Sequence, residues 1–127
     1  PMYVDTNIIV DFLRERKESK VFMENYIGTL KTSIIVKLEL IDGLQTKREI
    51  KILTKQVFNN LQIEVIQLNE EVSKKAEEIF VSYRHSHGIS INDSIIAATA
   101  LSLGESIATH NAKHFDFIPN LKLIKPY

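Results

Sequence analysis

Three carboxylates stand in otherwise apolar stretches of the chain, and their chemistry needs an explanation. Asp5 follows the apolar start Met2-Tyr3-Val4, Glu39 lies inside a run of aliphatic residues, and Asp93 opens an Ala-rich segment. An acid in apolar surroundings costs free energy unless it is paired, hydrogen-bonded or bound to a metal ion. Three such acids on separate segments therefore predict a shared cation, and a hard cation such as Mg²⁺ suggests phosphate chemistry.

Each acid also has a purely structural explanation when it is taken alone. Asp5 could cap the helix that follows it by accepting backbone N–H bonds. Asp93 stands three residues after Ser90, which is the spacing of a capping box. Glu39 could face solvent, although Gly43 lies about 40° away around the same helix and leaves room for a ligand. One explanation covers all three acids better, because carboxylates that converge repel each other and divalent cations relieve that repulsion.

Short apolar runs alternate with longer helical patterns, and this alternation places the acids. We expect strands at residues 2–4, 31–33, 64–67, 106–109 and 121–124, and helices at 8–14, 20–27, 35–44, 48–60, 70–87 and 92–103. The alternation favours an α/β fold with a mainly parallel sheet. In such folds, sites form outside the carboxyl ends of the strands. Asp5 and the segment Thr109-His110-Asn111 fall at such ends, and Glu39 and Asp93 lie in helices that could begin at the same edge.

Composition excludes several classes of function. The chain has 127 residues, which we interpret as a single domain spanning residues 1–127, and 44% of them are hydrophobic. No apolar run is long enough to span a membrane and no secretory signal is visible. The absence of cysteine excludes thiol catalysis and fits a cytoplasmic protein. A net charge of zero argues against a protein that coats nucleic acid, but not against a nuclease whose metal ions supply positive charge.

Four segments, in order, resemble the motifs of PIN-domain proteins, and most closely those of the VapC ribonuclease toxins of prokaryotic toxin–antitoxin pairs. The resemblance covers nearly the whole chain. Each motif alone is weak to moderate, but four in order at these spacings are specific. The segments are Met2-Tyr3-Val4-Asp5-Thr6-Asn7-Ile8-Ile9, then Thr32-Ser33-Ile34 through Glu39-Leu40-Ile41-Asp42-Gly43, then Asp93-Ser94-Ile95-Ile96-Ala97-Ala98-Thr99-Ala100, and Ile107-Ala108-Thr109-His110-Asn111-Ala112-Lys113-His114-Phe115.

The resemblance implies a PIN-like fold, with a mainly parallel central sheet of about five strands flanked by helices. It also implies cleavage of RNA that depends on Mg²⁺ or Mn²⁺. Asp5, Glu39 and Asp93 would form the catalytic acidic metal site. Thr6 and Ser33 would hydrogen-bond these acids or metal-bound water. The resemblance further suggests a homodimer and a VapB-type antitoxin, with tRNA as a reasonable substrate.

The fourth motif departs from the family pattern. Many relatives carry an Asp where this chain has Asn111. An amide oxygen can still ligate a hard cation without adding charge, and Asp116 is the alternative fourth ligand. Around the expected edge, Arg14, His110 and Lys113 are candidates to bind the RNA backbone. His110 is more simply explained as a surface loop residue, and Arg14 at least as well as part of an ordinary solvated helix end.

Other functions find less support in the sequence. Phosphatases with an Asp nucleophile need a second Asp two residues later, and this chain has Asn7 there. Receiver domains need paired acids before the phosphorylated Asp, which are missing. The histidine pair His110 and His114 lacks the rest of a zinc ligand set. The alternative that remains open is a catalytically degenerate PIN domain that binds an antitoxin or RNA, and Asn111 is the residue that keeps it open.

Overall fold

Five short strands form one parallel sheet in the computed structural model, which describes residues 2–127. The strand order is β3-β2-β1-β4-β5, and each pair of neighbours is parallel. This confirms the predicted α/β fold with a parallel sheet of about five strands. The strands are β1 (Met2–Val4), β2 (Leu30–Ser33), β3 (Glu64–Ile66), β4 (Ile107–Ala108) and β5 (Leu123–Ile124).

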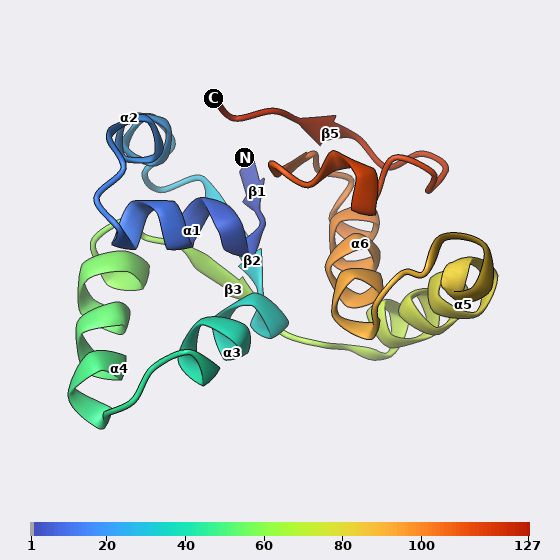
Figure 1. Cartoon of the computed structure of the whole chain (residues 1–127), viewed down its shortest axis with the longest axis horizontal. Coiled ribbons are helices and arrows are strands. Elements are labelled where there is room, and N and C mark those ends of the chain that lie inside the picture. Colours follow the sequence, from blue (N-terminus) through green and yellow to red (C-terminus); the bar gives the residue numbers. More distant parts are fainter. Residues whose placement is uncertain (1) are drawn as a thin grey trace.

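Helices cover the strands from both sides. Figure 1 shows α1, α2 and α4 on one side of the strands and α5 and α6 on the other, with α3 between them. The α-helices are α1 (Thr6–Leu13), α2 (Lys17–Asn25), α3 (Ile34–Asp42), α4 (Lys47–Leu53), α5 (Glu70–His87) and α6 (Ile91–Leu103). The helix predicted at 48–60 is α4 continued by a π-helical stretch, Thr54–Asn59. A single turn of 3₁₀-helix, Ala112–His114, lies between β4 and β5.

The central strands are buried on both faces, as a parallel sheet between two helix layers requires. Tyr3 and Val4 of β1 are fully buried, and so are Ile107 and Ala108 of β4. The Ala-rich segment of α6 is buried as well, because its small side chains allow the helix to pack closely. No helix within residues 2–127 is both long and apolar enough to cross a membrane.

The strand order reverses between β1 and β4, and this reversal determines where a site can form. From β1 the chain proceeds outward through β2 to β3, and it then returns to the other side of β1 to form β4 and β5. At such a point the connections leave the sheet in opposite directions and open a crevice at the carboxyl ends of the strands. The backbone N–H of Asp5 donates to the Ala108 carbonyl at 3.1 Å, which holds the ends of β1 and β4 side by side.

Candidate active site

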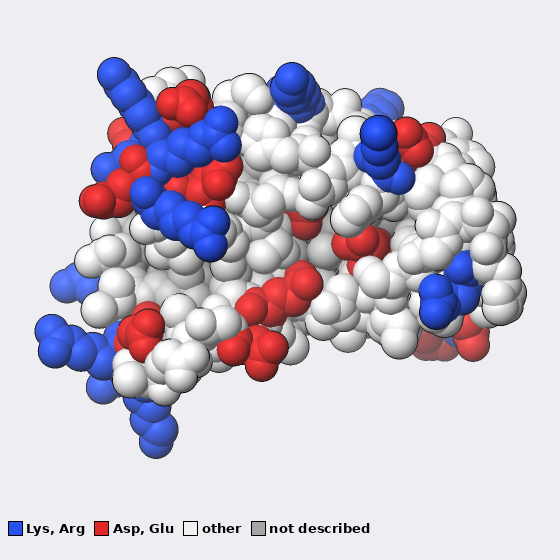
Figure 2. All heavy atoms as spheres, viewed as in Figure 1, with Lys and Arg blue, Asp and Glu red and all other residues white. Residues whose placement is uncertain are grey.

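A cavity of about 520 Å³ opens where β1 and β4 end, and we call it the acidic cavity. Asp5, Glu39 and Asp93 all line it, although they come from the N-cap of α1, from α3 and from α6. Asn111, from the segment after β4, lines it too. The fold therefore brings together the three acids and the amide that the sequence singled out. Figure 2 shows acidic side chains in the middle of this face, between α1 and the C-terminal segments.

Asp5 is the most deeply buried of these acids, with 5% of its surface exposed. Its Oδ1 accepts the backbone N–H of Thr6 at 2.7 Å, so the predicted capping role is confirmed. Its Oδ2 accepts the Thr109 hydroxyl at 2.8 Å and the Asn7 amide at 3.3 Å. Burial raises the pKa of Asp5, and the charge of Asp93 raises it further. Asp5 is thus held in place by its neighbours while its charge is costly.

Glu39 projects from α3 across the cavity toward α1 and α6. Its Oε1 accepts the Thr6 hydroxyl at 3.0 Å, and its Oε2 accepts the Asn92 amide at 3.2 Å. The solvent-facing alternative is therefore wrong, because both carboxylate oxygens are engaged by residues of the cavity. Thr6 touches two of the acids, Asp5 through its backbone and Glu39 through its hydroxyl.

Asp93 occupies the first turn of α6, where its backbone and side chain do different things. The Ser90 hydroxyl caps the helix by accepting the Asp93 N–H at 3.0 Å, as the spacing predicted. The carboxylate instead reaches the cavity, where Oδ2 lies 3.2 Å from Nδ1 of His114. Burial raises the pKa of Asp93, Glu39 raises it as well, and His114 opposes them. The capping explanation thus accounts for Ser90 but leaves the carboxylate free for chemistry.

The donor set of the acidic cavity suits a hard divalent cation. Carboxylate and amide oxygens are the ligands that Mg²⁺ and Mn²⁺ prefer. The pKa values of Asp5 and Asp93 are raised, chiefly by burial, so the charged forms of both carboxyl groups are disfavoured in this cavity. Among residues 2–127, no three His, Cys, Asp or Glu side chains stand close enough to hold one ion. The fit to a metal ion is thus one of donor chemistry.

The remaining predicted residues divide between inside and outside the cavity. Arg14 lines the acidic cavity, whereas His110 and Lys113 line a neighbouring one. Ser33 is buried and caps α3, accepting the backbone N–H of Ile35 at 3.1 Å, and it does not line the acidic cavity. Asp116 is exposed and lies outside both cavities. Asn111 rather than Asp116 therefore stands beside the three acids.

Sequence reasoning did not assign roles to several residues that hold the site together. Asn7, Asn92 and Thr109 donate to the acids, and His114 contacts Asp93. A local signal could have identified two of them: Asn7 and Asn92 are polar residues within two positions of a predicted site acid. His114 had been considered only as half of a metal-binding pair.

Asp11 is a fourth acid of the cavity wall, and it ties the site to the C-terminal segment. Its Oδ2 accepts the Tyr127 hydroxyl at 2.7 Å and an Arg16 N–H at 3.2 Å. The ring of His110 packs edge-on against the ring of Tyr127, with 4.5 Å between the ring centroids. The His110 Nε2 atom lies 3.9 Å from Asp11 Oδ2. His110 lies in the loop after β4 and is half-buried, and this cluster holds its ring beside Asp11 and Tyr127.

The comparisons with known proteins agree with this architecture. The chain is similar to ribonuclease VapC19 of Mycobacterium tuberculosis (strain CDC 1551 / Oshkosh), with 29% identity over 123 residues that cover 94% of this chain and 95% of the relative. Its structure resembles a toxin–antitoxin complex from Klebsiella pneumoniae, with a TM-score of 0.78, 25% identity, and coverage of 100% of this chain and 98% of the other. It also resembles VapBC-1 from nontypeable Haemophilus influenzae, with a TM-score of 0.76, 26% identity, and coverage of 97% and 96%. The family model for the PIN domain matches residues 2–119, so the chain belongs to the PIN-domain family, as its four motifs predicted.

Proposed function

We propose that this protein is a metal-dependent endoribonuclease and the toxin of a VapBC-type toxin–antitoxin pair. The observation that carries the proposal is the acidic cavity, in which Asp5, Glu39 and Asp93 meet Asn111 at the switch point of the sheet. Relatives named ribonuclease VapC support the reaction class. Similarity to toxin–antitoxin complexes at 25% and 26% identity supports a VapB-type antitoxin as partner, and we also propose a homodimer.

In this proposal the carboxylates hold Mg²⁺ or Mn²⁺, with Asn111 as a neutral oxygen ligand. The bound cation supplies Lewis acidity to the phosphodiester and to the attacking water. The protein contributes position: Thr109, Asn7 and the Thr6 backbone fix the Asp5 carboxylate, while Thr6 and Asn92 fix Glu39. Because these hydrogen bonds already orient the carboxylates, little free energy is spent on ordering them when the cation binds. Hydrolysis by water, without a covalent enzyme intermediate, is the reaction we expect.

The proposal is tested by incubating the purified protein with total cellular RNA, with tRNA as a separate substrate, in Mg²⁺, Mn²⁺ or EDTA. We expect discrete products in either metal and none in EDTA, and sequencing of the new ends identifies the substrate. A folded, metal-loaded protein that binds an antitoxin but cuts no RNA would favour the degenerate binding module instead. The residue that motivates this alternative, Asn111, is checked in the same assay by Asn111→Asp.

Replacement of Thr109 by Val tests whether the ordering of Asp5 matters for the reaction. Val keeps the shape of Thr but removes the hydroxyl that donates to Asp5 Oδ2 and accepts the Asn111 N–H. Loss of a hydrogen bond behind a metal ligand typically lowers metal affinity or activity by about 10- to 100-fold. We expect a loss of this size in kcat/KM, together with weaker Mn²⁺ binding by calorimetry. Thr99→Val is the matched control, because the Thr99 hydroxyl donates to a carbonyl within α6. Equal losses in both variants would contradict a specific role for Thr109.

A further inference from the structure

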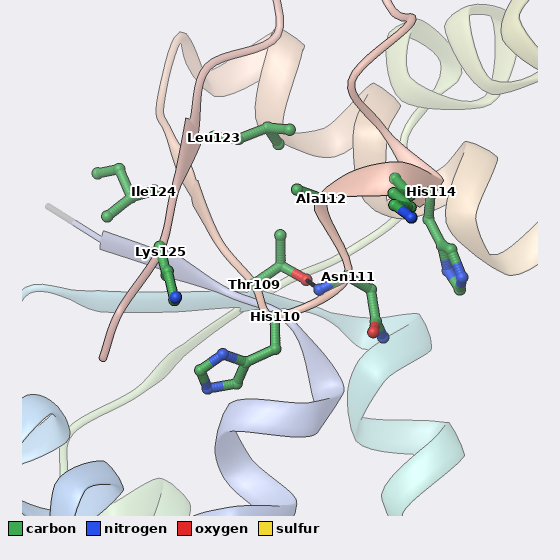
Figure 3. A pocket seen from close by; sticks show the side chains of 9 residues that line it. Thr109, His110, Asn111, Ala112, His114, Leu123, Ile124 and Lys125 are labelled. Atoms are coloured by element: carbon green, nitrogen blue, oxygen red, sulfur yellow. Dashed lines mark hydrogen bonds between the residues drawn. The ribbon is translucent and has the colours of Figure 1, made fainter.

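A second cavity, of about 600 Å³, lies beside the acidic cavity and has the opposite character. It is formed by the end of β4, the turn at 112–114 and the segment of β5, and we call it the basic cavity. Figure 3 shows Thr109 at its centre, with Leu123, Ile124 and Lys125 on one side and Ala112 and His114 on the other. Asn111 and His114 line both cavities, so the two adjoin each other.

The charges of the two cavities differ although the chain as a whole is neutral. Asp5, Asp11, Glu39 and Asp93 line the acidic cavity. None of the described residues that line the basic cavity is Asp or Glu, and Lys113 and Lys125 stand exposed at its rim. In Figure 2, basic side chains lie over the C-terminal segments, next to the acidic middle of the face. An anionic ligand is therefore attracted to one cavity and repelled by the other until the acids are neutralised.

The walls of the basic cavity are mixed rather than purely polar. Leu123 and Ile124, which are half-buried, and Ala112, which is exposed, add apolar groups to a lining that also holds the two lysines. The His110 ring forms a further wall, and its edge-on packing against Tyr127 holds it in place. A ligand with an anionic group and a flat apolar part matches this lining, and the volume is that of a small-ligand site. A nucleotide of single-stranded RNA has both parts, namely a phosphate and a base that stacks on apolar or aromatic side chains.

We propose that the basic cavity binds the nucleotide that adjoins the cleaved phosphate of an RNA strand. Lys113 and Lys125 contact backbone phosphate, and the base lies against Leu123, whose side chain points toward Thr109 and Ala112. The strand then passes Asn111 and His114 into the acidic cavity, where its next phosphate meets the carboxylates. This inference rests on the proposed ribonuclease function and adds a substrate-binding subsite to it.

The test measures RNA binding separately from cleavage. A fluorescently labelled single-stranded RNA is titrated with the full-length protein in EDTA, where cleavage should be off, at several salt concentrations. We expect Lys113→Ala/Lys125→Ala to weaken binding by about 10-fold or more at low salt. Loss of two phosphate contacts should also reduce the slope of log K against log[salt] by about 1.4, since each contact to a single strand contributes roughly 0.7. In Mg²⁺ the same variant should raise KM for cleavage much more than it lowers kcat.

Lys122→Ala is the matched control, because Lys122 is an exposed lysine directly before β5 that does not line either cavity. It should bind and cleave RNA as the parent does. An unchanged affinity and salt slope in the double variant, with cleavage by the parent intact, would overturn the subsite and leave the ribonuclease standing. A parent that neither binds nor cleaves RNA would overturn both. Loss of binding to an acidic peptide, with RNA binding unchanged, would assign the cavity to a protein partner and likewise overturn the subsite.

Discussion

Replacing Asp5 or Asp93 with Asn should lower kcat/KM for RNA cleavage by about 10³-fold or more. Each change removes one negative charge from the acidic cavity and keeps the size of the side chain. A metal ligand contributes several kcal/mol to the transition state through the ion it holds, and each 1.36 kcal/mol corresponds to a factor of roughly ten. The measurement is the initial cleavage rate of a defined RNA at saturating Mg²⁺ or Mn²⁺.

The same variants should stay folded, which separates a loss of chemistry from a loss of structure. Burial raises the pKa of both acids, so their charged forms are disfavoured in the folded protein. A neutral Asn avoids that cost, and at position 5 it can still accept the Thr6 N–H that caps α1. We therefore expect melting temperatures at neutral pH that equal or exceed that of the parent. Asp42→Asn, an exposed acid at the end of α3, is the matched control and should leave cleavage unchanged. Equal cleavage by the parent and by both site variants would mean that these acids are not the catalytic site.

The second large effect is on stability, and it couples pH to metal binding. Without metal, the ionisation of Asp5 and Asp93 should lower the free energy of unfolding as the pH rises above the ordinary Asp pKa of 3.8. The pKa values of Asp5 and Asp93 are both raised above the ordinary 3.8. Between 3.8 and those raised values, the folded state binds more protons than the unfolded state, so unfolding becomes easier as the pH rises. This contribution is fully present below the ordinary pKa and is lost as the pH passes through the folded pKa.

A divalent cation should reverse this trend, because it binds the deprotonated carboxylates. At a cation concentration 100 times the dissociation constant, binding to the folded state adds about 2.7 kcal/mol of stability. The gain should be largest near neutral pH and should shrink in acid, where protons compete for the same oxygens. Thermal unfolding with EDTA or with Mn²⁺, at several pH values between about 4 and 8, measures both effects.

The double variant Asp5→Asn/Asp93→Asn isolates these two groups from the other acids and histidines of the chain. We expect it to show a smaller loss of stability between acidic and neutral pH than the parent, and almost no stabilisation by Mn²⁺. Stabilisation by Mn²⁺ that is the same in the parent and in the double variant would place the cation elsewhere and contradict the assignment of the acidic cavity.

Much of the fold followed from local signals in the sequence. Asn69 caps α5 by accepting the Val72 N–H at 2.8 Å, and Gly88 ends that helix with a left-handed φ of 64°. Both were predicted because a cap or a helix stop depends on a residue and its near neighbours. The helix at 48–60 was predicted with the wrong detail, since its second half is a π-helical stretch that the side-chain pattern did not distinguish.

The sequence by itself singled out three acids and predicted that they meet at one edge of a parallel sheet, where the structure places them in one cavity. Asp5, Glu39 and Asp93 could be identified because a carboxylate in an apolar run is costly wherever the chain places it. Only the tertiary structure decided what surrounds them. Asn111, not Asp116, lines the acidic cavity. The basic cavity lies beside the acidic one. Thr109 donates a hydrogen bond to Asp5, and Asn92 donates one to Glu39. These contacts join residues more than fifty positions apart, so they depend on how the strands and helices pack and leave no local pattern in the sequence.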